Sequence, residues 1–83
     1  MSYELTRHAR HVLEERQIPA AWMERALTSP ALVELSAADA TLESRFVRIA
    51  EHGNRVLRVV VNKSVVPLRV VRVYFDRTMK DRP

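Results

Sequence analysis

The segment from Arg55 to Arg77 contains two runs of β-branched residues with interspersed arginines, and a short polar break at Asn62–Ser64 separates them. Alternation of apolar and polar side chains over such runs is typical of strands that bury one face. Two runs around a short break predict an antiparallel hairpin. Leu42–Ala50 has the same character and predicts a third strand, which a turn at Glu51–Asn54 joins to the hairpin.

The preceding part of the chain has a helical period. Apolar residues recur every three or four positions in Arg7–Arg16 and in Pro19–Thr28, which predicts two amphipathic helices. Thr6 is expected to cap the first helix, because its hydroxyl can accept a hydrogen bond from an unpaired amide of the first turn. Ser29–Pro30 ends the second helix, since proline disfavours helical backbone in the residue before it.

Shorter runs complete the predicted domain. Tyr3–Leu5 and Ala31–Leu35 predict short strands, Ser36–Thr41 predicts a mobile loop, and the charged tail Thr78–Pro83 is expected to fray. The chain is expected to form one domain, 1–83, because 83 residues support a single core. The predicted fold class is α+β: two N-terminal helices pack on one face of a small curved antiparallel sheet of about four to five strands, in the order β-α-α-β-β-β-β.

Side chains alternate between the two faces of a strand, so parity gives a register for the sheet. This register places two apolar rows against the helices, Val47–Val59–Val71 and Ile49–Leu57–Val73. On the uncovered face it places Arg48, Arg58 and Arg72 side by side, with Tyr74 near them. Adjacent guanidinium groups repel one another, so this face is expected either to bind an anion or to pair with acidic side chains such as Asp76.

Charge and composition narrow the function. The formal net charge of +4 and a pI of about 10.3 favour an anionic partner, such as nucleic acid or an acidic protein. The absence of cysteine excludes disulfides and cysteine nucleophiles, and the single glycine excludes a glycine-rich phosphate loop. No apolar run has the length of a signal or membrane-spanning segment, so a cytoplasmic location without membrane association is expected.

The three histidines are weak candidates for chemistry. His8 and His11 are three residues apart and share one side of the first helix. Without cysteine or an H-E-x-x-H pattern they do not predict a metal site, and neither a metal nor a cofactor is expected. His8 is expected either to be a surface residue or to act as an acid or base beside the arginines. His52 is expected to serve only the turn.

Several short motifs resemble a known family. Thr6–Ala9, Glu15–Pro19 and a second helix that ends at Pro30 resemble the opening of the bacterial family called domain of unknown function 4258. Arg55–Val61 and Val70–Phe75 resemble that family's last two strands. The family is similar to BrnT and to the RelE/ParE-like group, whose members are small basic proteins with two helices on a curved antiparallel sheet. The resemblance therefore implies a RelE-like fold.

The resemblance also implies a function and a site. Many members of the group are toxins of toxin–antitoxin systems that cleave messenger RNA, so the function implied is RNA binding with metal-independent endoribonuclease activity. RNA or the ribosome, and an acidic antitoxin-like protein, are the implied partners. The residues that match such a site are His8, Arg58, Arg72 and Tyr74 as catalytic candidates, and Arg48, Arg58, Arg72 and Arg77 as nucleic-acid contacts. The alternative is a non-catalytic protein-interaction module or a homodimeric domain of the same fold.

Overall fold

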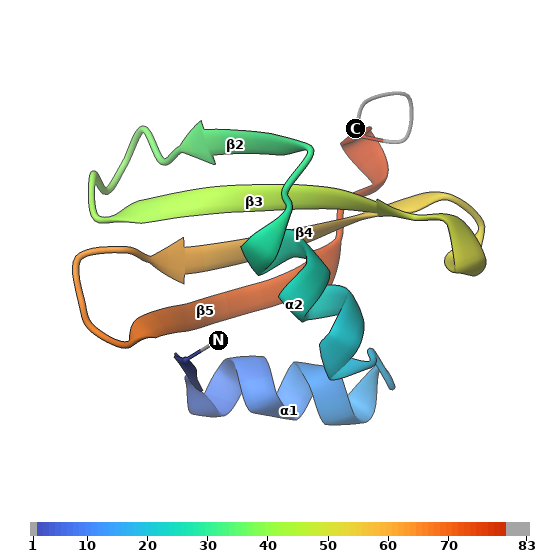
Figure 1. Ribbon diagram of the computed structural model, residues 1–83, viewed down its shortest axis with the longest axis horizontal. Helices are drawn as coiled ribbons and strands as arrows, with labels where there is room; N and C mark the ends of the chain where they lie inside the picture. The colour runs from blue at the N-terminus through green and yellow to red at the C-terminus, as the bar shows by residue number, and fades with distance from the viewer. Residues whose placement is uncertain (1, 80–83) are drawn as a thin grey trace.

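The computed structural model describes residues 2–79, in which two helices pack on one face of a five-stranded sheet (Figure 1). The helices are α1, Arg7–Glu15, and α2, Ala20–Thr28. The strands are β1, Tyr3–Leu5; β2, Leu32–Leu35; β3, Leu42–Ile49; β4, Arg55–Asn62; and β5, Leu68–Phe75. Two short 3-10 helices follow β3 and β5: η1, Ala50–His52, and η2, Arg77–Met79. The predicted α+β class and element order are confirmed. None of the helices in this range is long and apolar enough to cross a membrane.

The sheet has the strand order β1-β5-β4-β3-β2 and is mixed rather than wholly antiparallel. The pairings among β2, β3, β4 and β5 are antiparallel, as predicted for consecutive strands with short connections. β1 instead runs parallel to β5, with Tyr3 opposite Leu68 and Leu5 opposite Val70. The two strands lie at opposite ends of the chain, so no tight turn forces them to run antiparallel.

The ends of the helices follow from local chemistry. The Thr6 hydroxyl accepts a hydrogen bond from the Ala9 amide at 3.1 Å, which confirms the predicted N-cap. The same hydroxyl donates to the Val71 carbonyl at 3.1 Å and so ties the start of α1 to β5. Gln17 ends the first helical segment with a left-handed φ of 54°, and Pro19 occupies the N-cap of α2.

The core lies between the helices and the sheet. Apolar residues of α1, α2 and the chain between them meet alternate residues of the central strands. This cluster contains Ala9, Leu13, Ile18, Met23, Ala26, Leu27, Val47, Ile49, Leu57, Val59, Val61, Val70 and Val73. Full burial of a Val, Leu, Ile or Met side chain stabilises the fold by about 1.5–3 kcal/mol. Burial of this cluster therefore holds the two helices against the sheet.

A smaller cluster covers the opposite face of the sheet near its end. Phe46 and Val56 are buried there against Met79 of η2, and Leu32 packs beside them. The expectation that the tail frays from Thr78 onward is therefore wrong for Thr78 and Met79, because η2 has an apolar residue to bury. The rest of that tail, residues 80–83, lies outside the described residues.

Both predicted hairpins form, but the predicted register is wrong. Val47 lies opposite Leu57 rather than Val59, because the turn between β3 and β4 holds the five residues Ala50–Asn54. Gly53 and Asn54 adopt left-handed φ values of 65° and 57°, which let the chain reverse within this turn. The pairing is displaced by two residues, so each side chain of these two strands stays on its predicted face.

A β-bulge displaces the second hairpin. Val60 lies opposite Arg72 and Val61 opposite Val70, so Val71 is an extra residue without a partner on β4. Val70, not Val71, enters the core. The alternation of apolar and polar side chains does not reveal such a bulge, because it inserts a single residue without a turn signal.

Candidate functional site

The three arginines expected side by side share a face of the sheet but lie in different rows. Parity keeps Arg48, Arg58 and Arg72 on the face that the helices leave bare, whereas the two register shifts separate them. Their neighbours differ: Arg58 lies opposite Phe46 and Tyr74, Arg48 opposite Val56, and Arg72 opposite Val60. The predicted row of guanidinium groups is therefore absent from residues 2–79.

Arg58 is engaged by the protein itself. Its Nη1 donates to Asp76 Oδ2 at 3.0 Å, and its Nε donates to the Ser44 hydroxyl at 3.0 Å. The guanidinium also lies between two aromatic rings, 5.1 Å from the centroid of Phe46 and 5.8 Å from that of Tyr74. These contacts give Arg58 a structural role, in which it joins the end of β5 to the middle of the sheet.

Asp76 completes this arrangement from the residue that precedes η2. Its Oδ1 accepts hydrogen bonds from the Thr78 hydroxyl at 2.5 Å and from the Thr78 amide at 3.0 Å, while Oδ2 binds Arg58. The Thr78 hydroxyl first, and Arg58 with it, lowers the pKa of the Asp76 carboxyl below its usual value. Both carboxylate oxygens thus have partners, so the charge of Asp76 is compensated within the fold.

His8 does not join the other catalytic candidates. It lies exposed near the start of α1, which covers the face of the sheet opposite to Arg58. The hypothesis that His8 acts beside the arginines is therefore not supported by the geometry. Tyr74 and Arg72 do share a face and are both exposed, Tyr74 to 39%.

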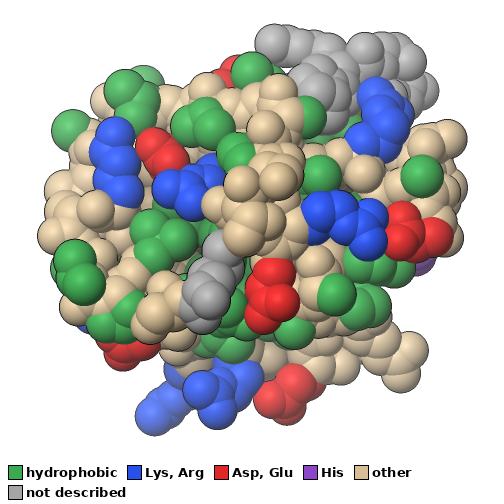
Figure 2. All heavy atoms as spheres, in the orientation of Figure 1, with side chains coloured by type: hydrophobic (Ala, Val, Ile, Leu, Met, Phe, Trp, Pro, Cys, Tyr) green, Lys and Arg blue, Asp and Glu red, His purple; other side chains and the backbone are tan. Residues whose placement is uncertain are grey.

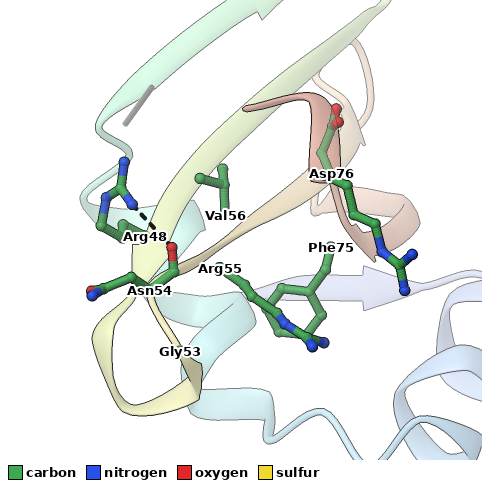
Figure 3. A pocket seen from close by; sticks show the side chains of 8 residues that line it. Arg48, Gly53, Asn54, Arg55, Val56, Phe75 and Asp76 are labelled. Carbon is green, nitrogen blue, oxygen red and sulfur yellow. Dashed lines mark hydrogen bonds between the residues drawn. The ribbon is translucent and has the colours of Figure 1, made fainter. Parts of the chain in front are cut away.

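A different group of cations gathers at the end of the sheet, where η1 and the start of β4 meet the end of β5. A cleft of about 440 Å³ opens there (Figure 3). Its lining is Arg48, Gly53, Asn54, Arg55, Val56, Phe75, Asp76 and Arg77. Arg48 Nη1 donates to the Asn54 carbonyl at 3.0 Å, so this arginine braces the turn that leads to Arg55.

A second cleft, of about 490 Å³, adjoins the first. The two share Arg55, Phe75 and Arg77, and the second reaches round to α1. The further residues of its lining are Val12, Arg16, Ile18, His52 and Tyr74. Arginines from three separate elements thus meet around one continuous surface.

The positive charge of this surface is not neutralised within the described chain. Arg16, Arg55 and Arg77 make no side-chain hydrogen bond or ion pair with another residue between positions 2 and 79. The carboxylate nearest along the chain to each of these arginines has another partner: Glu15 pairs with His11, Glu51 binds Arg25 through a bidentate contact at 3.0 and 3.1 Å, and Asp76 binds Arg58. The two clefts consequently present a net positive potential.

His52 and Phe75 line the second cleft, and both contact Trp22, which lies outside the lining. His52 lies 4.8 Å from Phe75 and 5.3 Å from Trp22 between ring centroids, and Trp22 meets Phe75 edge to face at 6.3 Å. We call these three residues the aromatic cluster. The cluster holds His52 at the rim of the cleft, although the residue itself is exposed.

Sequence reasoning missed part of this surface. It identified Arg48, Arg77 and Tyr74, but not Arg16 or Arg55, and it assigned His52 to the turn alone. A usable signal was present, because Arg55 starts one strand just after a turn and Arg77 follows the last strand. In an antiparallel pair the start of one strand and the end of the next lie at the same end of the sheet.

The comparisons with known proteins give a family and no more. A family model described as "Domain of unknown function (DUF4258)" matches residues 5–75, which is most of the chain. No curated protein and no solved structure matched. The matched range contains Arg16, His52 and Arg55 and ends just before Arg77. The expected similarity to BrnT and to the RelE-like group stays a prediction.

Proposed function

We propose that this chain, which belongs to the family described as "Domain of unknown function (DUF4258)", binds nucleic acid through the two clefts at the η1 end of its sheet. One observation carries the proposal: Arg16, Arg55 and Arg77 line a continuous surface and have no acidic partner among residues 2–79. Contacts to phosphate supply most of the affinity of sequence-independent nucleic-acid binding, and arginine is suited to them. RNA is the nucleic acid that the family resemblance implies.

The distribution of the cations supports a polymer rather than a single small anion. Arg16 is at the end of α1, Arg55 at the start of β4 and Arg77 in η2, so the charges are spread around the rim instead of converging on one point. A chain of phosphates can contact several such groups at once. The net charge of +4 would further accelerate association with a polyanion.

Salt-dependent binding tests the proposal. Anisotropy of a labelled single-stranded RNA is measured between about 50 and 200 mM salt for the wild type and for the double variant R55A/R77A. Loss of two phosphate contacts should weaken binding at low salt and reduce the salt slope by about 1.4, at about 0.7 per contact with a single strand.

The matched control is Arg69→Ala. Arg69 is exposed on the same strand as Phe75 but near its other end, so the variant removes one charge without touching either cleft. Retention of binding by R69A together with loss in R55A/R77A is the expected pattern. Equal losses in both, or wild-type affinity in R55A/R77A, would exclude the clefts as the binding surface.

Metal-independent cleavage of RNA is a further hypothesis, which the family resemblance supplies. The same RNA samples, incubated with a chelator and resolved by length, test it together with growth arrest on induced expression. Cleavage by the wild type that survives chelation supports the endoribonuclease hypothesis. Intact RNA and normal growth would mean that the protein binds RNA without cleaving it. An acidic antitoxin-like protein would then compete with RNA for the same basic surface.

The outer strand β2 supports a second candidate function, the formation of a homodimer. β2 is the outer strand, and its side chains Val33 and Leu35 are 46% and 66% exposed on one face. Figure 2 shows hydrophobic side chains on the surface at the end of the molecule where β2 finishes. An exposed apolar edge strand is suited to pairing with a second copy of itself. Sedimentation at micromolar concentration, with Leu35→Lys as the disruptive variant, tests this homodimer, and a monomeric wild type would exclude it.

A further inference from the structure

We infer that the second cleft holds an unstacked base, so that the ligand is a single strand whose phosphates lie on Arg55 and Arg77 and whose base stacks on His52. The inference rests on the proposed function and adds the class of nucleic acid and the residues that select it. It follows from the aromatic wall of this cleft, which binding to phosphates alone does not require.

The dimensions and lining of the second cleft suit one base. Its volume of about 490 Å³ is within the range of small-ligand sites, about 300–1,000 Å³. Its lining is mostly polar: three arginines contribute to it together with the apolar side chains of Val12, Ile18 and Phe75. A lining that combines aromatic rings with cations matches a nucleotide, which joins a flat ring system to a charged phosphate.

The rings are held in place before a ligand arrives. His52 contacts both Trp22 and Phe75, and Trp22 and Phe75 are partly buried against the main core. The left-handed residues Gly53 and Asn54 fix the turn that carries His52 and Arg55. A prearranged aromatic surface loses little side-chain entropy on binding, and this favours stacking.

A duplex would not satisfy this site. Bases within a duplex are stacked on their neighbours, and extracting one costs a few kcal/mol. A duplex can therefore use the arginines but not the aromatic wall. Base–aromatic stacking contributes about 1–3 kcal/mol per base in proteins that bind single strands, which corresponds to about 5- to 150-fold in affinity.

Three probes separate these contributions for the full chain: a single-stranded RNA of about eight nucleotides, the same strand with abasic nucleotides, and its blunt duplex. At one salt concentration the base-containing strand should bind about tenfold more tightly than either of the others. Arg55→Ala should weaken binding of all three probes, because each of them offers phosphates. Absence of binding to any probe by the wild type would reject the proposed function itself.

His52→Ala tests the aromatic wall. It should lower affinity for the base-containing strand by about tenfold, leave the abasic strand unaffected and keep the salt slope of the wild type. His11→Ala is the matched control, because His11 is exposed on α1 and lines neither cleft. His52→Phe keeps a ring and should retain tight binding. Tight binding by this variant would show that substitution at position 52 does not by itself unfold the protein. Equal affinity of the wild type for base-containing and abasic strands, or equal loss in the Phe and Ala variants, would overturn the inference and leave phosphate binding intact.

Discussion

Arg58 and Asp76 form an ion pair between the middle of β4 and the end of β5, with Nη1 3.0 Å from Oδ2. The Asp76 side chain is only 8% exposed, and that of Arg58 is 31% exposed. Arg58 therefore uses its charge to anchor the segment that leads into η2, where Met79 covers Phe46 and Val56. Arg58 therefore stabilises the fold, although it lies on the bare face of the sheet, and it does not line the cationic clefts.

Removal of the Arg58 charge should destabilise the protein. Arg58→Met would leave the Asp76 carboxylate nearly buried without its cation, and we expect a loss of about 3 kcal/mol in the free energy of unfolding. The double variant R58M/D76N should lose less than the sum of its two single variants, since it leaves no unpaired charge. Urea unfolding of the four proteins gives the coupling energy. A coupling energy near zero would mean that the pair does not anchor η2.

Stability should fall in acid, partly through Asp76. Its folded-state pKa is lowered, chiefly by the Thr78 hydroxyl and also by Arg58, so its contribution is present above the unfolded pKa of about 3.9 and is lost as the pH falls through the folded value. We expect little change in urea midpoint between pH 7 and 5 and a decline below about pH 4. Asp76→Asn should show a shallower decline. An identical acid profile for the variant would contradict the assignment.

The alternation of residues was sufficient to predict the strands, and Thr6 was sufficient to predict the start of α1. Parity also placed Arg58 and Arg72 on the correct face. It could not predict the register, because the pairs next to the Ala50–Asn54 turn are shifted by two residues, which leaves the faces unchanged, and because the bulge at Val71 brings Val70 instead of Val71 into the core.

The site was harder to predict than the fold. The spacing of residues on α1 does not tell which side of the sheet the helix covers, so His8 was placed beside arginines from which the sheet separates it. Ion pairs between distant residues are equally hidden, and Asp76 therefore changed the role of Arg58. The clefts depend on Arg16, Arg55 and Arg77, which come together only through the topology of the sheet.

The turn that carries Arg55 should tolerate little change at Gly53. A Cβ at this position would meet no atom within 4 Å, so the cost of Gly53→Ala comes from the left-handed φ of 65° alone. We expect a loss of about 1–2 kcal/mol in the free energy of unfolding. Gly53→Asn should cost less, because asparagine tolerates this conformation better. Chemical denaturation of both variants checks the order, and the reverse order would show that conformation is not the cause.

The Tyr3–Glu24 contact should make stability sensitive to alkali. The hydrogen bond to the Glu24 carboxylate, at 2.7 Å, is the first cause that raises the pKa of Tyr3 to about 12, and burial adds to it. A raised folded pKa gives stability that is complete below the unfolded value of about 10 and is lost as the pH rises toward 12. Tyr3→Phe should therefore lose less stability than the wild type between about pH 10 and 12. Parallel alkaline profiles for the two proteins would contradict this.

Variants of Arg72 and Arg55 distinguish RNA binding at the predicted row of arginines from RNA binding at the clefts. Both are exposed, but Arg72 lies opposite Val60 and lines neither cleft, whereas Arg55 lines both. Arg72→Ala should change the free energy of unfolding by no more than about 0.5 kcal/mol, as is usual for surface positions. If the strand follows the clefts, R72A should bind RNA within about twofold of the wild type, and R55A should lose one phosphate contact with its salt slope reduced by about 0.7. A larger loss in R72A than in R55A would move the binding surface onto the bare face of the sheet, where the sequence first placed it.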